Sequence, residues 1–112
     1  MFESAVCEWC DKWRDEVGPV YSKTDEGKQV PLRVISVHEP RPVVYRAING
    51  IVFTPTFVLW DKGREIGRIS GYPGESFFWG LLGELIERLD SGRKEDRARE
   101  ANPPVSGTPV GR

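Results

Sequence analysis

Only two cysteines occur in the 112 residues, and they stand three positions apart as Cys7-Glu8-Trp9-Cys10. Residues 1–6 have strand character and a helical pattern follows, which places Cys7 at the expected first turn of a helix. The unpaired N–H groups and partial positive charge of a helix start favour a thiolate there. Because a thiolate attacks disulfides and a thiol hardly does, the motif predicts thiol–disulfide exchange.

The sequence offers little support for metal chemistry. Two cysteines cannot close a four-sulfur zinc site within one chain, and the single histidine, His38, lies beyond an expected strand. A transient carrier of copper(I) on Cys7 and Cys10 is the weakest alternative, since the motif lacks methionine or histidine help. An inert disulfide is also disfavoured, because a bond across so short a loop constrains little of the unfolded chain. We therefore expect no metal ion and no cofactor.

Composition narrows the partners and the compartment. The formal net charge of −1 does not favour nucleic acid or an anionic membrane surface. No apolar run approaches the roughly 20 residues that cross a bilayer. Residues 1–6 do not resemble a secretory signal, but a chain from which a signal peptide or an upstream strand had been removed would begin in the same way. The composition therefore leaves both cytoplasm and periplasm open.

The C-terminal residues differ in character from the rest. Hydrophobic residues make up 38% of the chain, below the share of a typical globular domain. The charged block 93–100 suits a solvated extension of a helix, whereas the segment 102–109, which contains Pro103, Pro104 and Pro109, favours disorder. We expect one domain over residues 1–90 and a flexible tail over 91–112.

Periodicity and turn residues predict alternating strands and helices. In chain order we expect a helix at 7–21 broken near Gly18-Pro19, a polar connection at 23–28, a strand at 32–37, a short helix near 43–47, a strand at 57–60, a turn at 61–64, a strand at 65–70 and an amphipathic helix at 75–89. A Cys-x-x-Cys motif that lies between a strand and the following helix is typical of a redox-active cysteine pair.

The apolar residues of these elements predict the core. On the last helix, an apolar stripe recurs at spacings of three and four. The expected core or core-edge residues are Trp13, Phe57, Trp60, Ile66, Ile69, Phe77, Phe78, Trp79, Leu81, Leu82, Leu85, Ile86 and Leu89. Trp9, between the cysteines, is expected to be partly exposed.

These motifs together resemble the thioredoxin-fold family from the first residues to about Leu89. The residues that carry the resemblance are Cys7-Glu8-Trp9-Cys10, Thr54-Pro55-Thr56-Phe57-Val58, the hairpin through Gly63, and Gly71-Tyr72. The resemblance implies an α/β fold with a central mixed β-sheet of about four strands flanked by helices. It also implies a cis bond before Pro55, facing the cysteines, and a backbone at Thr54 that pairs with an extended substrate.

A finer resemblance points to one branch of the family. The stretches Thr-Pro-Thr-Phe-Val-Leu, Gly-Arg-Glu-Ile-Gly-Arg and Gly-Tyr-Pro-Gly-Glu-Ser-Phe-Phe-Trp are similar to the periplasmic thioredoxin of the bacterial sulfur-oxidation (Sox) system. This resemblance implies a periplasmic location and a sulfur-carrier protein as the partner.

The chain departs from thioredoxin at two places. Val6 precedes the first cysteine where thioredoxin has tryptophan, and Glu8-Trp9 replace its glycine and proline. Thioredoxin also keeps a buried aspartate six residues before the first cysteine, where Met1 stands here. Glu3 is the candidate substitute, although its side chain is equally able to face solvent.

The expected mechanism assigns a different role to each cysteine. Cys7 attacks a protein disulfide and Cys10 resolves the mixed disulfide, after which an upstream thiol reductant restores the dithiol. Trp9, Thr54, Pro55 and Tyr72, with Phe53, are the expected substrate-binding residues. A redox-sensing regulatory binding module that uses the same disulfide as a switch is the alternative.

The charges around the motif predict the direction of the reaction. The carboxylates Glu8, Asp11, Asp15 and Glu16 oppose a thiolate, and no histidine lies inside the motif to help form one. Strong oxidants of this fold need a strongly stabilised thiolate, so a reductase is expected.

Overall fold

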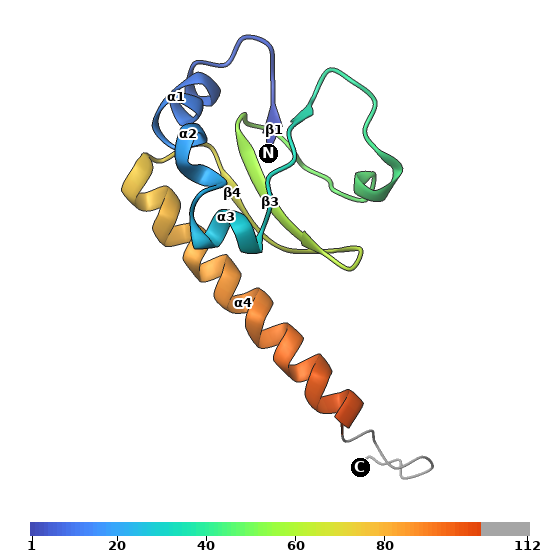
Figure 1. Ribbon diagram of the computed structural model, residues 1–112. Coiled ribbons are helices and arrows are strands. Elements are labelled where there is room, and N and C mark those ends of the chain that lie inside the picture. The colour runs from blue at the N-terminus through green and yellow to red at the C-terminus, as the bar shows by residue number, and fades with distance from the viewer. Residues whose placement is uncertain (102–112) are drawn as a thin grey trace.

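In the computed structural model, which describes residues 1–101, a four-stranded sheet is flanked by helices (Figure 1). The strand order is β2-β1-β3-β4. The strands are β1 (Phe2–Glu3), β2 (Ile35–Ser36), β3 (Thr56–Asp61) and β4 (Arg64–Ser70). β1 and β2 run parallel, whereas β3 is antiparallel to both β1 and β4. The sheet is mixed and has four strands, which confirms the expected α/β architecture.

Helices connect the two parallel strands. α1 spans Glu8–Glu16 and α2 spans Gly18–Tyr21, so the predicted break falls between them. Pro19 lies in the first turn of α2, where its missing N–H leaves no helical hydrogen bond unmade. The break lets the chain turn while Val17, fully buried, keeps both helices against the core.

A third helix, α3 (Asp25–Gln29), replaces the expected polar connection. Thr24 caps this helix, since its hydroxyl oxygen accepts a hydrogen bond from the N–H of Gly27 at 3.0 Å. A threonine cap followed by acidic residues in the first turn is a helix start signal. The prediction of a connection was wrong because the threonine cap and the acidic first turn favour a helix despite the polar composition of the segment.

The segment between β2 and β3 is mostly irregular and lies on the side of the sheet away from α1 and α4 (Figure 1). It contains one short 3₁₀ helix, η1 (Val43–Tyr45), near the expected short helix. Ile48 is buried, and the ring of Tyr45 meets Trp60 of β3 edge-on at 6.4 Å. β2 is shorter than the strand predicted over 32–37.

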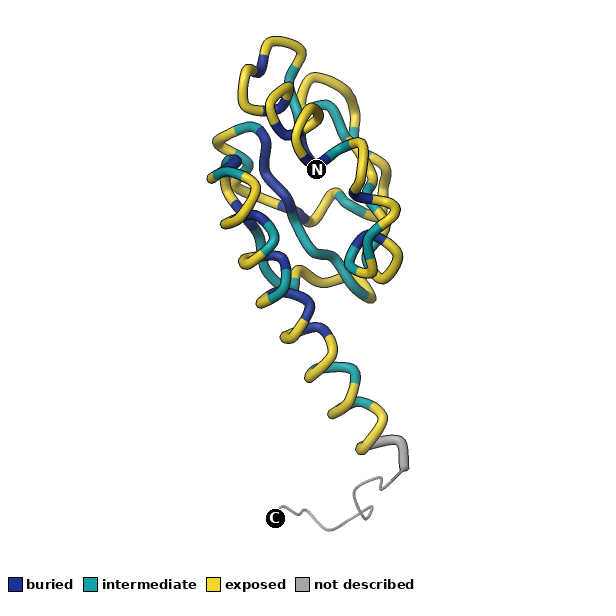
Figure 2. Tube along the Cα trace, turned by 60° about the vertical axis from the view of Figure 1, so that its left-hand side comes forward, coloured by how far each residue is buried: buried dark blue, intermediate teal, exposed yellow. Residues whose placement is uncertain are grey.

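The core lies between the sheet, α1 and the first half of α4 (Glu75–Ala101), as the buried positions in Figure 2 show. Five of the six residues of the predicted stripe are buried: Phe78, Leu82, Leu85, Ile86 and Leu89. The sixth, Leu81, is 38% exposed, so its place in the core was wrongly predicted. Phe77 was expected in the core, but its side chain is 71% exposed. It lies one position off the stripe, and a shift of one residue turns a helical side chain by about 100°.

The hairpin and the end of the last helix follow the sequence closely. Lys62 and Gly63 have φ of 52° and 79°, the two positive values that a tight hairpin turn requires. α4 continues from the predicted end near Leu89 to Ala101, so the charged block does lengthen a helix. The segment 102–109, which was predicted to be disordered, lies outside the described residues, and the domain boundary near residue 90 stays a prediction.

Within residues 1–101, none of the helices combines the length and apolarity needed to cross a membrane.

Two glycines of the fold give a matched test of packing. A Cβ on Gly27 would lie 1.8 Å from the carbonyl oxygen of Tyr21, whereas a Cβ on Gly80 of α4 would meet nothing within 4 Å. We expect Gly27→Ala to destabilise the protein by about 3 kcal/mol through overpacking against backbone. Gly80→Ala should stabilise it by about 0.5–1 kcal/mol, because alanine favours a helix interior. Urea unfolding of both variants measures the difference, and equal midpoints would contradict the close packing of α3 on α2.

Candidate active site

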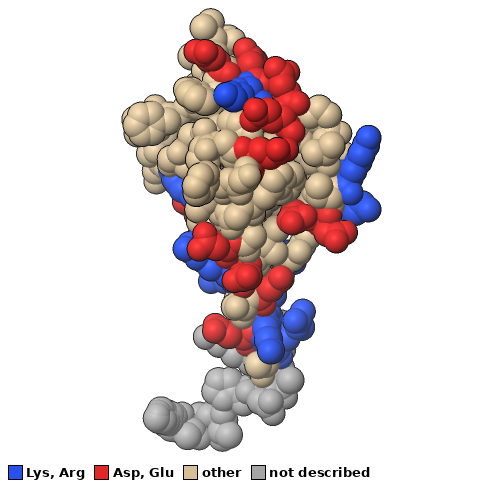
Figure 3. All heavy atoms as spheres, turned by 90° about the vertical axis from the view of Figure 1, so that its left-hand side faces the viewer, with Lys and Arg blue, Asp and Glu red and all other residues tan. Residues whose placement is uncertain are grey.

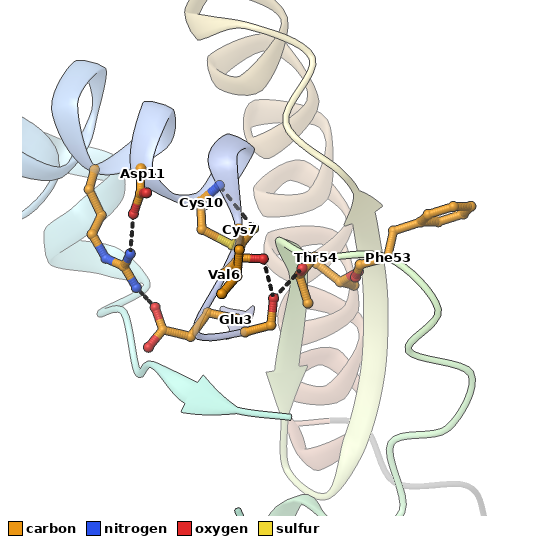
Figure 4. Close-up of a disulfide and its surroundings, with 10 residues drawn as sticks. Glu3, Val6, Cys7, Cys10, Asp11, Phe53 and Thr54 are labelled. Atoms are coloured by element: carbon orange, nitrogen blue, oxygen red, sulfur yellow. Dashed lines mark hydrogen bonds and ion pairs between the residues drawn. A yellow bond between two sulfur atoms is a disulfide. The ribbon is translucent and has the colours of Figure 1, made fainter. Parts of the chain in front are cut away.

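Cys7 and Cys10 form a disulfide at the start of α1 (Figure 4), and their Cα atoms lie 5.2 Å apart. β1 ends at Glu3, and the short loop after it carries Cys7 to the helix cap. Cys7 is 7% exposed, whereas Cys10 is fully buried. Cys7 is thus the more exposed of the two cysteines, as the sequence predicted.

The sulfur of Cys7 occupies the position of a helix-capping oxygen. The backbone N–H of Cys10 donates to Cys7 Sγ at 3.1 Å. This position is normally taken by the side chain of serine, threonine or aspartate, which satisfies an unpaired N–H of the first turn. The geometry places Cys7 Sγ at the positive end of the helix dipole, where negative charge is favoured.

A second loop meets the disulfide loop through two hydroxyl groups. Ser4 Oγ lies 3.0 Å from Thr54 Oγ1, although 50 positions separate the residues in the chain (Figure 4). The bond between Thr54 and Pro55 is cis. Pro55 is fully buried, and its carbonyl oxygen accepts a hydrogen bond from the N–H of Gly71 at 2.7 Å. The loops before α1, before β3 and after β4 therefore come together.

Exposed apolar side chains stand on two of these loops and on α1. Val6 is 95% exposed, Trp9 53% and Phe53 64%. The Nζ of Lys12 lies 5.4 Å from the ring centroid of Trp9. Figure 4 shows Phe53 projecting away from the sulfur atoms. We call Val6, Trp9 and Phe53 the apolar rim.

Tyr72 does not belong to this exposed surface. Its side chain is 6% exposed, and its hydroxyl donates to Glu16 Oε1 at 2.6 Å. Burial raises the pKa of Tyr72 above its usual value, and the hydrogen bond to Glu16 raises it further. The phenol stays a donor and ties the loop after β4 to α1. The expectation that the Tyr72 side chain offers a contact surface was therefore wrong.

The charge around the disulfide is mainly negative. α1 exposes Glu8, Asp11, Asp15 and Glu16, and acidic side chains gather at this end of the molecule in Figure 3. Arg14 pairs with Asp11 at 3.2 Å and also with Glu3. The carboxylate of Glu3 therefore lies against Arg14 rather than in open solvent, although this contact does not give it a role in proton transfer.

Sequence reasoning missed Ser4 and the structural role of Glu16. Both act through partners far away in the chain, Thr54 and Tyr72, so no local pattern marks them. The sequence distinguishes Val6 only as a departure from thioredoxin and does not predict that its side chain is exposed beside the cysteines. His38, by contrast, lies exposed in the loop after β2. Among the described residues, no three His, Cys, Asp or Glu side chains gather as a metal site would require.

Comparison with solved structures identifies a relative of this chain. The crystal structure of the periplasmic thioredoxin SoxS from Paracoccus pantotrophus, in its reduced form, is 41% identical in sequence and superposes with a TM-score of 0.71. The match covers 80% of this chain and 94% of that one. Neither protein-family models nor curated proteins give a match. The chain therefore belongs to the thioredoxin family of thiol–disulfide oxidoreductases.

Proposed function

We propose that this protein reduces protein disulfides through Cys7 and Cys10. The observation that supports it most is the capped sulfur: Cys7 Sγ accepts the N–H of Cys10 at the helix start and is the more exposed of the two sulfur atoms. In the reduced protein the same N–H is placed to stabilise a thiolate at Cys7. Cys10, buried behind it, is suited to attack only after a mixed disulfide has formed.

The proposed cycle balances as a two-electron transfer. The Cys7 thiolate attacks one sulfur of the target disulfide, and the other target sulfur leaves as a thiolate. The Cys10 thiolate then attacks Cys7 Sγ, which releases the second target thiolate and forms the Cys7–Cys10 bond. Protons from solvent neutralise the released thiolates. An upstream dithiol restores the pair by the same exchange in reverse.

The substrate would bind beside Thr54. Within residues 1–101, the backbone N–H and C=O of Thr54 take part in no backbone hydrogen bond. An extended substrate segment can use these groups as a short added strand. Trp9, which is exposed, and the rest of the apolar rim would receive the apolar side chains of the segment. Pro55, which is buried, would contribute by fixing the backbone of Thr54 through its cis bond.

The electrostatics favour reduction over oxidation. Glu8 and Asp11 lie in the first turn of α1, close to Cys7. Their negative charge opposes a thiolate and offsets part of the benefit of the helix start. A strong oxidant owes its potential to a stabilised reduced form, which this charge arrangement does not favour.

The relative suggests the compartment and the partner. SoxS is a periplasmic thioredoxin. We propose that this protein also works in the periplasm and that its target is a sulfur-carrier protein of the sulfur-oxidation system. A thiol reductant on the same side of the membrane would supply the electrons.

Single cysteine variants test the two roles. We expect Cys10→Ser to accumulate a mixed disulfide with its target, because the resolving attack is lost, and Cys7→Ser to lose activity completely. Non-reducing mass spectrometry after incubation with insulin, a protein disulfide substrate, detects the trapped species. If the Cys10 variant traps nothing while the Cys7 variant stays active, the assignment of roles to the two cysteines is wrong.

A redox titration tests the direction of the reaction. We expect a reversible two-electron transition near about −230 to −270 mV, the range of glutaredoxins and thioredoxin. Trp9 fluorescence and the mass of the alkylated protein follow the transition. A value near about −120 mV would identify an oxidant and contradict the charge argument. Many turnovers with a supplied reductant identify a reductase, whereas a single reaction with a lasting change in binding identifies the redox-sensing alternative.

A further inference from the structure

Two arginines hold the irregular segment that leads to the substrate loop. Arg68 Nη2 donates to the carbonyl oxygen of Asn49 at 2.8 Å, and Arg68 Nη1 donates to that of Gly50 at 3.2 Å. Arg41 Nη1 donates to the carbonyl oxygen of Ile48. Three successive carbonyl groups outside any helix or strand thus accept hydrogen bonds from guanidinium groups. These bonds replace the backbone hydrogen bonds that a helix or strand would supply.

The side chain of Arg68 is itself held in place by its strand and by Glu65. It lies on β4, where it is opposite Val58 of β3. Its Nε and Nη2 donate to the two carboxylate oxygens of Glu65 at 2.7 and 2.6 Å. Such a bidentate pair fixes the plane of the guanidinium. The hydrogen bonds from Arg68 also lower the pKa of the Glu65 carboxyl, which stays charged at neutral pH.

The held segment is continuous with the substrate loop. Only residues 51–53 separate Gly50 from Thr54. At the far end of this stretch, Thr56 Oγ1 donates to the carbonyl oxygen of Phe53 at 2.6 Å, and Ser4 Oγ meets Thr54 Oγ1. The stretch 51–53, in which Val52 and Phe53 are exposed, is therefore anchored on both sides, by Arg68 before it and by side-chain hydroxyls after it.

We propose that Arg68 is a positioning residue for substrate binding: it holds the backbone at Asn49 and Gly50 so that Phe53 and Thr54 are presented in one arrangement to an extended substrate. The inference rests on the proposed disulfide reduction. Arg68 donates its hydrogen bonds to Glu65, Asn49 and Gly50 and takes no part in the exchange. A preorganised loop lowers the entropy lost when a substrate binds.

Arg68→Gln tests the proposal against a matched control, Arg64→Gln, which removes the same charge from an exposed position on β4. We expect Arg68→Gln to raise KM for insulin by about tenfold with kcat little changed, because substrate must now order the loop. Activity on hydroxyethyl disulfide, which is too small to span the loop, and the Cys7–Cys10 redox potential should stay at wild-type values. Arg64→Gln should leave all of these unchanged.

Two further variants separate positioning from general stability. Arg68→Lys keeps the positive charge but loses the planar guanidinium that donates several hydrogen bonds at once. Its KM should therefore lie between the KM of the wild type and that of Arg68→Gln. Phe53→Ala should also raise KM. In a protein that already carries Phe53→Ala, Arg68→Gln should raise KM by a smaller factor than it does in the wild type, since both substitutions act through the same loop. Additive effects, or equal losses on both substrates, would overturn the proposal.

Hydrogen exchange gives a readout that does not depend on activity. Arg68→Gln should speed amide exchange at residues 49–54 while α1 and α4 keep wild-type protection. Unchanged exchange at 49–54 would contradict the proposal even if KM rose. If the wild-type protein reduces neither disulfide, the proposed function fails, whereas the exchange experiment still decides whether Arg68 orders the loop.

Discussion

The contact of three aromatic rings determines where the cysteines lie. Trp13 of α1, Phe57 of β3 and Phe78 of α4 meet with ring centroids 4.9 to 5.8 Å apart. All three side chains are buried. Aromatic pairs at such separations attract one another, which adds to the stabilisation from burying their large apolar surface. Because Trp13 lies about one and a half turns into α1, fixing this ring against the sheet fixes the helix start, and so places Cys7 beside the loop that precedes β3.

Around that fixed helix start, three loops are joined by polar contacts in addition to the packing of Cys7, Cys10 and Tyr72 in the core. Ser4 reaches Thr54, Pro55 accepts from Gly71, and Tyr72 donates to Glu16. Buried polar groups need such partners, and each contact here joins two loops or a loop and α1. The core is therefore mainly apolar, whereas the arrangement of the site also depends on a few hydrogen bonds that single substitutions can remove.

Much of this arrangement could be predicted from local sequence. The cysteine spacing, the hairpin at Lys62-Gly63 and the stripe on α4 are short-range patterns with direct structural meaning. α3 was missed although Thr24 signals it, because the segment is short and polar. The burial of Tyr72 and the exposure of Phe77 depend on how elements pack, which spacing alone does not determine. The contacts of Ser4 and Arg68 join residues far apart in the chain, so no pattern in one segment reveals them.

α4 begins next to the redox loops and leads away from them (Figure 1). Leu89 is its last buried residue among those described, and the helix continues to Ala101, a further length of roughly 18 Å at 1.5 Å per residue. Arg93 still contacts Asp61 of β3 at 3.0 Å, so the helix leaves the body of the protein along a fixed direction. A solid support or fusion partner attached at the end of this helix, near residue 98, would therefore sit at the end opposite the thiols, and the protein could be immobilised there with its reactive face open to large substrates.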